Sequence, residues 1–193
     1  FSVKGETKAA ITSYQKAVLI KPDYADAYNN MANALQEKGD LKGAIESYNK
    51  VVLIQPHYAE AYYNMGIAYK GIDNTEAAIG SYKQAIKINP HYVEAFINIG
   101  IVLKDSGHHE AAINSYKQAL NIKPDYADAL FNMGVSLQDL GDLQGAISSY
   151  NKAVSINPDY AEAYNNMGSA LQDKSDLNAA VKSFQMALQA NPE

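Results

Sequence analysis

The side chains of this sequence that could catalyse a reaction or bind a metal are few and scattered. His57 and His91 occupy the same position directly after a proline, where Asp stands in other segments, which favours a helix-start role over a metal pair. His108 and His109 lie in a predicted turn, where we expect them to be solvated. The segment IDNTE lacks the ligand spacing and the closing Glu of a calcium loop.

No motif typical of an enzyme is present either. The sequence contains no cysteine, which excludes disulfides and thiolate metal sites. It also has no phosphate-binding glycine loop and no serine nucleophile motif. Serines recur at one fixed spacing, which indicates a structural role, at Ser13, Ser47, Ser81, Ser115, Ser149 and Ser183. We therefore predict no catalytic residues, no metal and no cofactor.

Composition narrows the range of partners. The net charge is −5 and all 16 basic residues are lysine, whereas nucleic-acid binding requires a basic surface. Without arginine, the chain lacks the bidentate side chain most used to hold phosphate or carboxylate. No apolar run is long enough for a bilayer, and the N-terminus lacks a signal-peptide pattern. We expect a cytoplasmic piece of a longer protein that binds neither nucleic acid nor membranes.

These side chains belong to a strict internal repeat. All prolines are separated by 34 residues, at Pro22, Pro56, Pro90, Pro124, Pro158 and Pro192. Counted from each proline, a tyrosine follows at position 2, an acid at 4, a small residue at 10, an alanine at 22 and an aromatic at 26. Apolar residues recur at spacings of three and four, as in amphipathic helices. Each repeat is therefore predicted to be a helix, a turn, a second helix and a short turn with the proline.

Two details of the repeat give local predictions. Asp125 with Asp128, like Asp159 with Glu162, resembles a capping box, so the residue after the proline should open the next helix. Small residues such as Gly66 should let the two helices of a repeat approach closely.

The pattern resembles the tetratricopeptide repeat over nearly the whole chain. The resemblance implies an all-α solenoid, a right-handed superhelix of stacked helix-turn-helix repeats whose first helices line the concave side. Leu130 departs from the usual aromatic, and Asp73 and Ser175 stand where the turn glycine is expected. We expect a single solenoid over residues 1–193, with a partial repeat at 1–24 and near-complete repeats at 25–58, 59–92, 93–126, 127–160 and 161–193.

An asparagine, a poor residue for a helix interior, follows each of the first five prolines at position 8. We call this set the asparagine ladder: Asn30, Asn64, Asn98, Asn132 and Asn166. Helical spacing puts Asn64 on one face with Glu60, Tyr63 and Ile67, which should be the concave face. Helices packed about 8–10 Å apart would offer one asparagine to every third residue of an extended peptide. The sequence is similar in this feature to the repeat domain of O-linked N-acetylglucosamine transferase, and the resemblance implies that the ladder grips an extended peptide backbone.

Several alternatives stay open. The asparagines could instead tie neighbouring first helices together. Nearby apolar positions could set selectivity or could pack adjacent helices: Tyr63, Ile67, Ile97, Ile101, Phe131 and Val135. The predicted function is a non-catalytic scaffold that binds a protein or peptide in extended conformation. The competing functions are a substrate-recruiting or targeting arm of a larger transferase, and a scaffold that self-associates end to end through uncapped terminal repeats.

Overall fold

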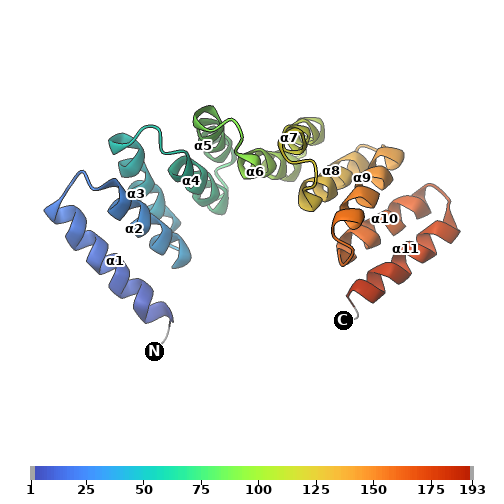
Figure 1. The fold of residues 1–193 in the computed structure, drawn as a ribbon, viewed down its shortest axis with the longest axis horizontal. Coiled ribbons are helices and arrows are strands. Elements are labelled where there is room, and N and C mark those ends of the chain that lie inside the picture. The colour runs from blue at the N-terminus through green and yellow to red at the C-terminus, as the bar shows by residue number, and fades with distance from the viewer. Residues whose placement is uncertain (1–2, 192–193) are drawn as a thin grey trace. The chain divides into compact units, whose positions relative to one another are not determined.

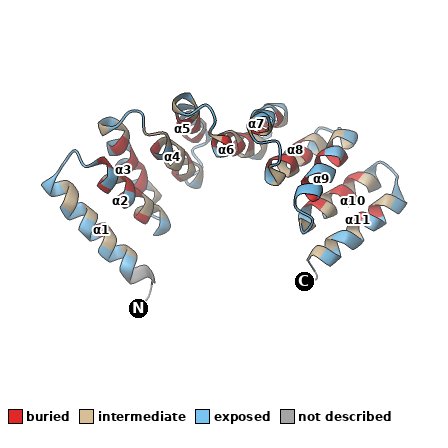
Figure 2. Ribbon diagram, in the orientation of Figure 1, coloured by how far each residue is buried: buried red, intermediate tan, exposed pale blue. Residues whose placement is uncertain are grey.

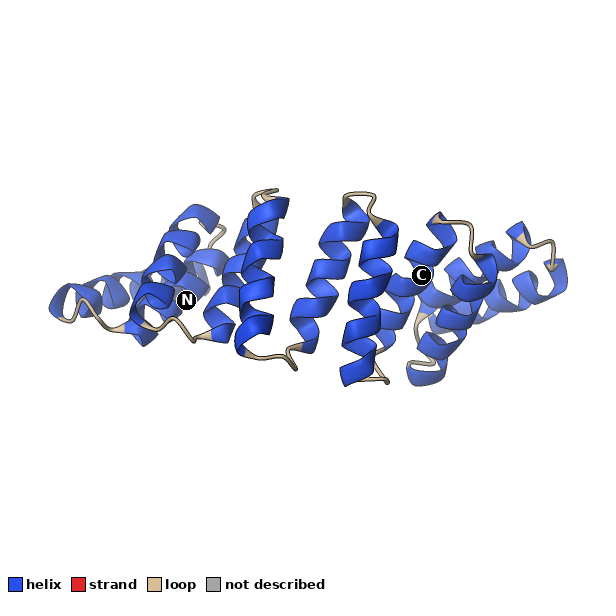
Figure 3. Cartoon of the chain, turned by 90° about the horizontal axis from the view of Figure 1, so that it is seen from above, coloured by secondary structure: helices blue, strands red, loops and turns tan. Residues whose placement is uncertain are grey.

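In this computed structural model the backbone is described for residues 3–191 and the side chains for residues 6–191. Pro192, the last proline of the repeat, lies outside the described residues. Within that range the chain forms eleven α-helices and no strand (Figure 3). The helices are α1 (Val3–Ile20), α2 (Ala25–Glu37), α3 (Leu41–Ile54), α4 (Ala59–Gly71), α5 (Thr75–Ile88), α6 (Val93–Asp105), α7 (His109–Ile122), α8 (Ala127–Asp139), α9 (Leu143–Ile156), α10 (Ala161–Asp173) and α11 (Leu177–Ala190).

The helices group into two compact units, with the border between Ala95 and Phe96, inside α6. In the first unit α2 pairs with α3 and α4 with α5, and α3 packs on α4 (Figure 1). In the second unit α8 pairs with α9 and α10 with α11, and α9 packs on α10. The predicted all-α stack of helix-turn-helix repeats is therefore confirmed.

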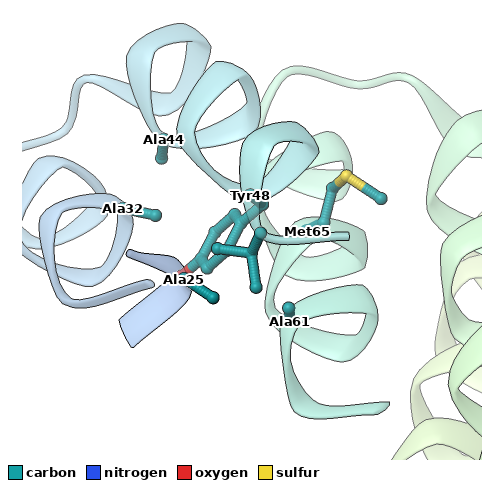
Figure 4. Packing of buried hydrophobic residues seen from close by; sticks show 7 residues of the cluster. Ala25, Ala32, Ala44, Tyr48, Ala61 and Met65 are labelled. Carbon is teal, nitrogen blue, oxygen red and sulfur yellow. The ribbon is translucent and has the colours of Figure 1, made fainter. Parts of the chain in front are cut away.

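The buried residues, red in Figure 2, lie where the paired helices meet, and they include many alanines. Figure 4 shows the ring of Tyr48 among Ala25, Ala44 and Met65. The aromatic at position 26 is 0% exposed in four repeats, at Tyr48, Tyr82, Tyr116 and Tyr150. Burying such a ring removes a large apolar surface from water and stabilises each pair.

The small residue at position 10 makes this packing possible. A Cβ atom added to Gly66 would lie 2.5 Å from the Tyr82 ring, and one added to Gly134 would lie 2.6 Å from the Tyr150 ring. Both distances are far below van der Waals contact, so the ring touches the backbone of the first helix. The predicted close approach of the two helices is confirmed.

The recurrent serines have the structural role that their spacing indicated. Each hydroxyl donates a hydrogen bond to the backbone carbonyl four residues earlier, at 2.8–3.1 Å. The hydroxyl is thus satisfied within its own helix.

The starts of the first helices differ from the prediction. The helices α2, α4, α8 and α10 begin three residues after the proline, and their N-cap tyrosines make no side-chain cap bond. The predicted capping boxes are therefore wrong. A backbone turn explains the delay, because the N–H of the N-cap tyrosine donates to the carbonyl of the residue before the proline, at 3.1 Å for Tyr24 and at 3.2 Å for Tyr58 and Tyr160.

The second helices are capped by side chains at position 18. Oxygens of Asp40, Asn74, Asp142 and Asp176 accept the N–H three residues later, at 2.9–3.2 Å. His108 holds the same position before α7 and makes no such bond. His109 is not solvated as predicted, because its side chain is 23% exposed and its Nδ1 lies 3.4 Å from a carboxylate oxygen of Asp139.

Candidate functional site

The asparagine ladder lies on the first helix of each repeat, on α2, α4, α6, α8 and α10. Asn30 is exposed, whereas the other four side chains are half-buried. None of the five is part of the core. Their amides can therefore reach solvent or a bound molecule.

In the first unit, the ladder residue Asn64 contacts a further asparagine, Asn33 of α2. Asn33 accepts the Tyr48 hydroxyl at 2.5 Å and the Nδ2 of Asn64 at 3.5 Å. Asn30 and Asn33 also line a cavity of about 440 Å³, together with Glu6, Thr7, Ala10 and Tyr14 of α1 and Ala34 and Glu37 of α2. The contact between Asn64 and Asn33 supports the alternative in which the asparagines tie first helices together.

In the second unit, the ladder residue Asn132 also makes its hydrogen bond within the protein. The Nδ2 of Asn132 donates to the backbone carbonyl of Asp128 at 2.8 Å, one turn earlier on its own helix. Asn166 lines a cavity of about 460 Å³ between α10 and α11.

These internal bonds use only part of the capacity of each amide. A primary amide carries two N–H donors and a carbonyl oxygen with two lone pairs. Asn132 uses one N–H in its bond to the Asp128 carbonyl. Its second N–H and its carbonyl oxygen remain for a ligand, and together they match the acceptor and donor of a peptide group. An internal bond of this kind also orients the amide before a ligand arrives.

The apolar neighbours of the ladder pack partly against the protein itself. Tyr63 stacks on Tyr92 with ring centroids 4.8 Å apart, and Phe131 lies 5.0 Å from Tyr160. Ile97 is only 6% exposed. The remaining three positions, Ile67, Ile101 and Val135, are half-buried. Tyr63 and Phe131 thus each pack against the tyrosine that follows the next proline along the chain.

The hydroxyl groups of the buried tyrosines form a second polar row that the sequence analysis did not identify. Tyr150 donates to Gln138 at 2.9 Å, and Tyr48 donates to Asn33. Among the described residues, the hydroxyls of Tyr82 and Tyr116 find no hydrogen-bond partner. The signal was present in the sequence: four of the five repeats have Tyr rather than Phe at position 26, which indicates a use for the hydroxyl.

The acid at position 4 influences the tyrosine that follows the next proline. Burial, followed by the charge of Asp128, raises the pKa of Tyr160. Burial, then Tyr63 and the Glu60 carboxylate, raises the pKa of Tyr92 to about 12. The charge of each acid thus favours the neutral form of a tyrosine in the stack.

The described part of the chain was also searched for a metal site and for a membrane-spanning helix. No three or more of its His, Asp and Glu side chains come together in a way that could hold a metal ion. None of the described helices combines the length and apolar character needed to cross a membrane.

Comparison of the sequence with models of known protein families shows which family it belongs to. A family model described as TPR repeat matches residues 3–39, 100–141 and 136–175. Two models described as Tetratricopeptide repeat match residues 23–91 and 161–193. A comparison with curated protein sequences finds no match.

Solved structures share the fold over most of the chain. A crystal structure of MamA protein is 30% identical, with a TM-score of 0.80, 87% of this chain covered and 92% of the other. MamA 41-end from Desulfovibrio magneticus RS-1 is 20% identical, with a TM-score of 0.80 and coverage of 87% and 95%. YrrB, described as a TPR protein with an unusual peptide-binding site, is 24% identical, with a TM-score of 0.76 and coverage of 93% of each chain. The chain belongs to the tetratricopeptide repeat family.

Proposed function

We propose that this chain is a non-catalytic scaffold that binds an extended segment of a partner protein through the asparagine ladder. The observation that carries the proposal is the ladder itself: one asparagine at the same position of every first helix, outside the core in all five repeats. A structural amide would be satisfied by burial and fixed partners. These side chains lie outside the core, and the internal partner of Asn64 differs from that of Asn132.

The chemistry of the amide explains why the partner would be held through its backbone. An asparagine side chain can donate to a peptide carbonyl and accept a peptide N–H together. Such contacts do not depend on the partner's side chains, so they provide affinity without sequence selectivity. Half-buried neighbours such as Ile67, Ile101 and Val135 are the positions that would add selectivity.

A protein of the same fold supports the class of ligand. YrrB is described as having a peptide-binding site, and its structure matches 93% of this chain. The proposed ladder mechanism is specific to the residues of this chain and rests on them alone.

The test compares the native chain with the triple variant Asn64→Ala, Asn98→Ala, Asn132→Ala in a pull-down from lysate read by mass spectrometry. Alanine favours helix, so circular dichroism should show both chains equally folded. The matched control replaces three exposed asparagines of second helices, Asn49→Ala, Asn114→Ala and Asn121→Ala.

Proteins that bind the native chain and the control, but not the ladder variant, would support the proposal and identify the partners. Fluorescence anisotropy with peptides from those partners would then measure the loss of affinity directly. Recovery of the same proteins by all three chains would show that the ladder is structural.

A further inference from the structure

A cavity of about 540 Å³ lies between the start of α4 and the end of α5, two helices that pair within the first unit. The pair stands between α3 and α6 along the chain, so this cavity does not arise at an end of the chain. None of its lining residues belongs to the asparagine ladder. They come from the turn before α4 and from both helices: Pro56, His57, Tyr62, Gln84, Lys87 and Ile88.

The polar groups of this lining are hydrogen-bond donors, and one of them is a cation. Lys87 carries an ammonium group, and Gln84 carries an amide with two N–H groups. The His57 imidazole and the Tyr62 hydroxyl can each donate one further hydrogen bond. Among the described residues, no carboxylate lines the cavity, although the chain has 21 acidic and only 16 basic residues. The lining therefore suits an anion.

The acids of the two helices lie away from this lining. The acid of α4, Glu60, is two residues before Tyr62, which is about 200° around the helix. After burial, the charge of Glu60 contributes to the raised pKa of Tyr48, which does not line the cavity. The acid of α5, Glu76, is in the first turn, about 16 Å along the helix from Lys87. Neither carboxylate cancels the positive character of the cavity.

Other repeats lack this combination of side chains at the equivalent positions. The residue directly after the proline is an acid in three repeats, at Asp23, Asp125 and Asp159. The position of Lys87 is uncharged in the other near-complete repeats, at Leu53, Asn121, Ser155 and Gln189. Only the repeat that begins at Pro56 thus combines a histidine in the turn with a lysine at the end of the second helix. Because the other repeats fold without this pair, the stack does not require it.

The same turn borders a second cavity, of about 390 Å³, which is lined by Gln55, Pro56, His57 and Tyr58. The two cavities share Pro56 and His57, so that one ligand can occupy both. Apolar surface in the two linings comes from Pro56, Ile88 and the rings of Tyr58 and Tyr62. A ligand that fills this space therefore needs an apolar body as well as a charged group.

We propose that these two cavities, together called the turn site, bind a carboxylate attached to an apolar or aromatic body. The carboxylate would accept hydrogen bonds from Lys87, Gln84 and His57, and the apolar body would lie against Pro56 and Ile88. One lysine matches the single charge of a carboxylate better than the charge of about −1.5 to −2 of a phosphate group. The carboxylate can come from a free organic acid or from an acidic side chain of a partner peptide.

The first experiment titrates the ¹⁵N-labelled chain with N-acetylphenylalanine and with its neutral match, N-acetylphenylalaninamide, and follows chemical shifts by NMR. For a probe of this size we expect a dissociation constant on the order of 1 mM. The acid should bind about fivefold more tightly than the amide, because its hydrogen bonds are charge-assisted. The largest shifts should occur at His57, Lys87 and Ile88.

A third probe separates the two sources of the carboxylate. The tripeptide of sequence FEA, blocked at both ends, carries its carboxylate on a side chain. Tighter binding of this tripeptide than of N-acetylphenylalanine would support the proposal with a partner peptide as the ligand. The reverse order would support it with a free organic acid as the ligand.

Variants of the chain locate the site, and each introduces a residue that another repeat carries at the same position. Lys87→Ser, which copies Ser155, should give the acid and the amide equal affinity. His57→Asp, which copies Asp125, should weaken binding of the acid about tenfold through charge repulsion. The matched control is Lys42→Ser at the exposed start of α3, which should keep the native preference for the acid.

Two results would overturn the proposal: equal binding of the acid and the amide by the native chain, or an unchanged preference for the acid in Lys87→Ser. The turn site does not depend on the proposed function of the ladder. The triple variant Asn64→Ala, Asn98→Ala, Asn132→Ala should therefore bind N-acetylphenylalanine normally, so that the two proposals can fail separately.

Discussion

The buried hydroxyl of Tyr150 donates a hydrogen bond of 2.9 Å to Oε1 of Gln138, fourteen residues after Pro124. One repeat earlier, Tyr116 is equally buried, but the position of Gln138 is occupied by Lys104, which supplies no acceptor. Within the described part of the chain the Tyr116 hydroxyl makes no hydrogen bond. An unsatisfied buried hydroxyl destabilises the fold.

Lys104→Gln should therefore increase the free energy of unfolding by about 1 kcal/mol, because Tyr116 gains an acceptor. The ion pair of Lys104 with Asp105, at 3.0 Å, is lost, but a pair whose carboxylate is half exposed to solvent contributes little. Urea denaturation measures the change, and the exposed Lys117→Gln is the control for charge. Tyr116→Phe should cost more in the Lys104→Gln background than in the native chain; equal costs in both would contradict the predicted bond.

Gly134→Ala should destabilise the chain by about 1–3 kcal/mol, because the new Cβ would lie 2.6 Å from the Tyr150 ring. The control is Gly80→Ala on α5, where a Cβ meets nothing within 4 Å. That substitution should stabilise by about 0.5–1 kcal/mol through helix propensity alone. Thermal unfolding monitored by circular dichroism measures the stability of both variants. A change of the same sign for Gly134→Ala and Gly80→Ala would refute the packing argument.

Ser175→Gly should stabilise the chain by about 1 kcal/mol. Ser175 has a φ of +66°, a left-handed conformation that strains residues with a Cβ. Asp73, with a φ of +57°, is also left-handed, but Asp tolerates this region better, so Asp73→Gly should gain less. Gly141→Ser, at a φ of +79°, is the reverse control and should destabilise in the same denaturation assay.

His108→Asp should stabilise the start of α7 by about 1 kcal/mol, since an Asp there can accept a free backbone N–H as Asp142 does before α9. The reciprocal change Asp142→His should cost a similar amount. Hydrogen exchange of the first turn of each helix reports the effect locally. Equal protection in native and variant chains would show that α7 is capped in another way.

Alkaline pH should unfold the chain. Burial is the largest cause that raises the pKa of seven tyrosines above the ordinary value of 10.0: Tyr48, Tyr58, Tyr82, Tyr92, Tyr116, Tyr150 and Tyr160. Above pH 10.0 the unfolded chain loses these protons first, so the folded state binds more protons and stability falls as pH rises. The decline should continue through the folded pKa of about 12 of Tyr92.

Denaturation midpoints measured from pH 8 upward, with tyrosinate absorbance recorded in parallel, test this order of events. The buried tyrosines should ionise together with loss of helix. Ionisation of all 15 tyrosines of the chain near pH 10.0 in a fully helical protein would contradict the prediction.

The sequence by itself determined the repeat architecture, because each local signal recurs with a period of 34 residues. Proline positions, helical spacing of apolar residues and the small residue facing an aromatic all act over a few turns of helix. Such short-range rules need no knowledge of the tertiary structure. Short-range rules also explain the recurrent serines and the turn residues Asp73 and Ser175. Each of these residues acts on the backbone within four residues of itself.

Tertiary structure decided what each polar side chain contacts. Asn33 accepts a hydrogen bond from Tyr48, fifteen residues away, and His109 lies beside Asp139 of the next helix, and neither contact follows from helical periodicity. The helix starts also escaped prediction, because a backbone turn from the residue before the proline to the following tyrosine delays the first turn of the helix. Hydrogen bonds between helices depend on which side chain occupies one facing position. A one-residue change, such as Lys104 for Gln138 in the next repeat, alters the bond while leaving the repeat pattern unchanged.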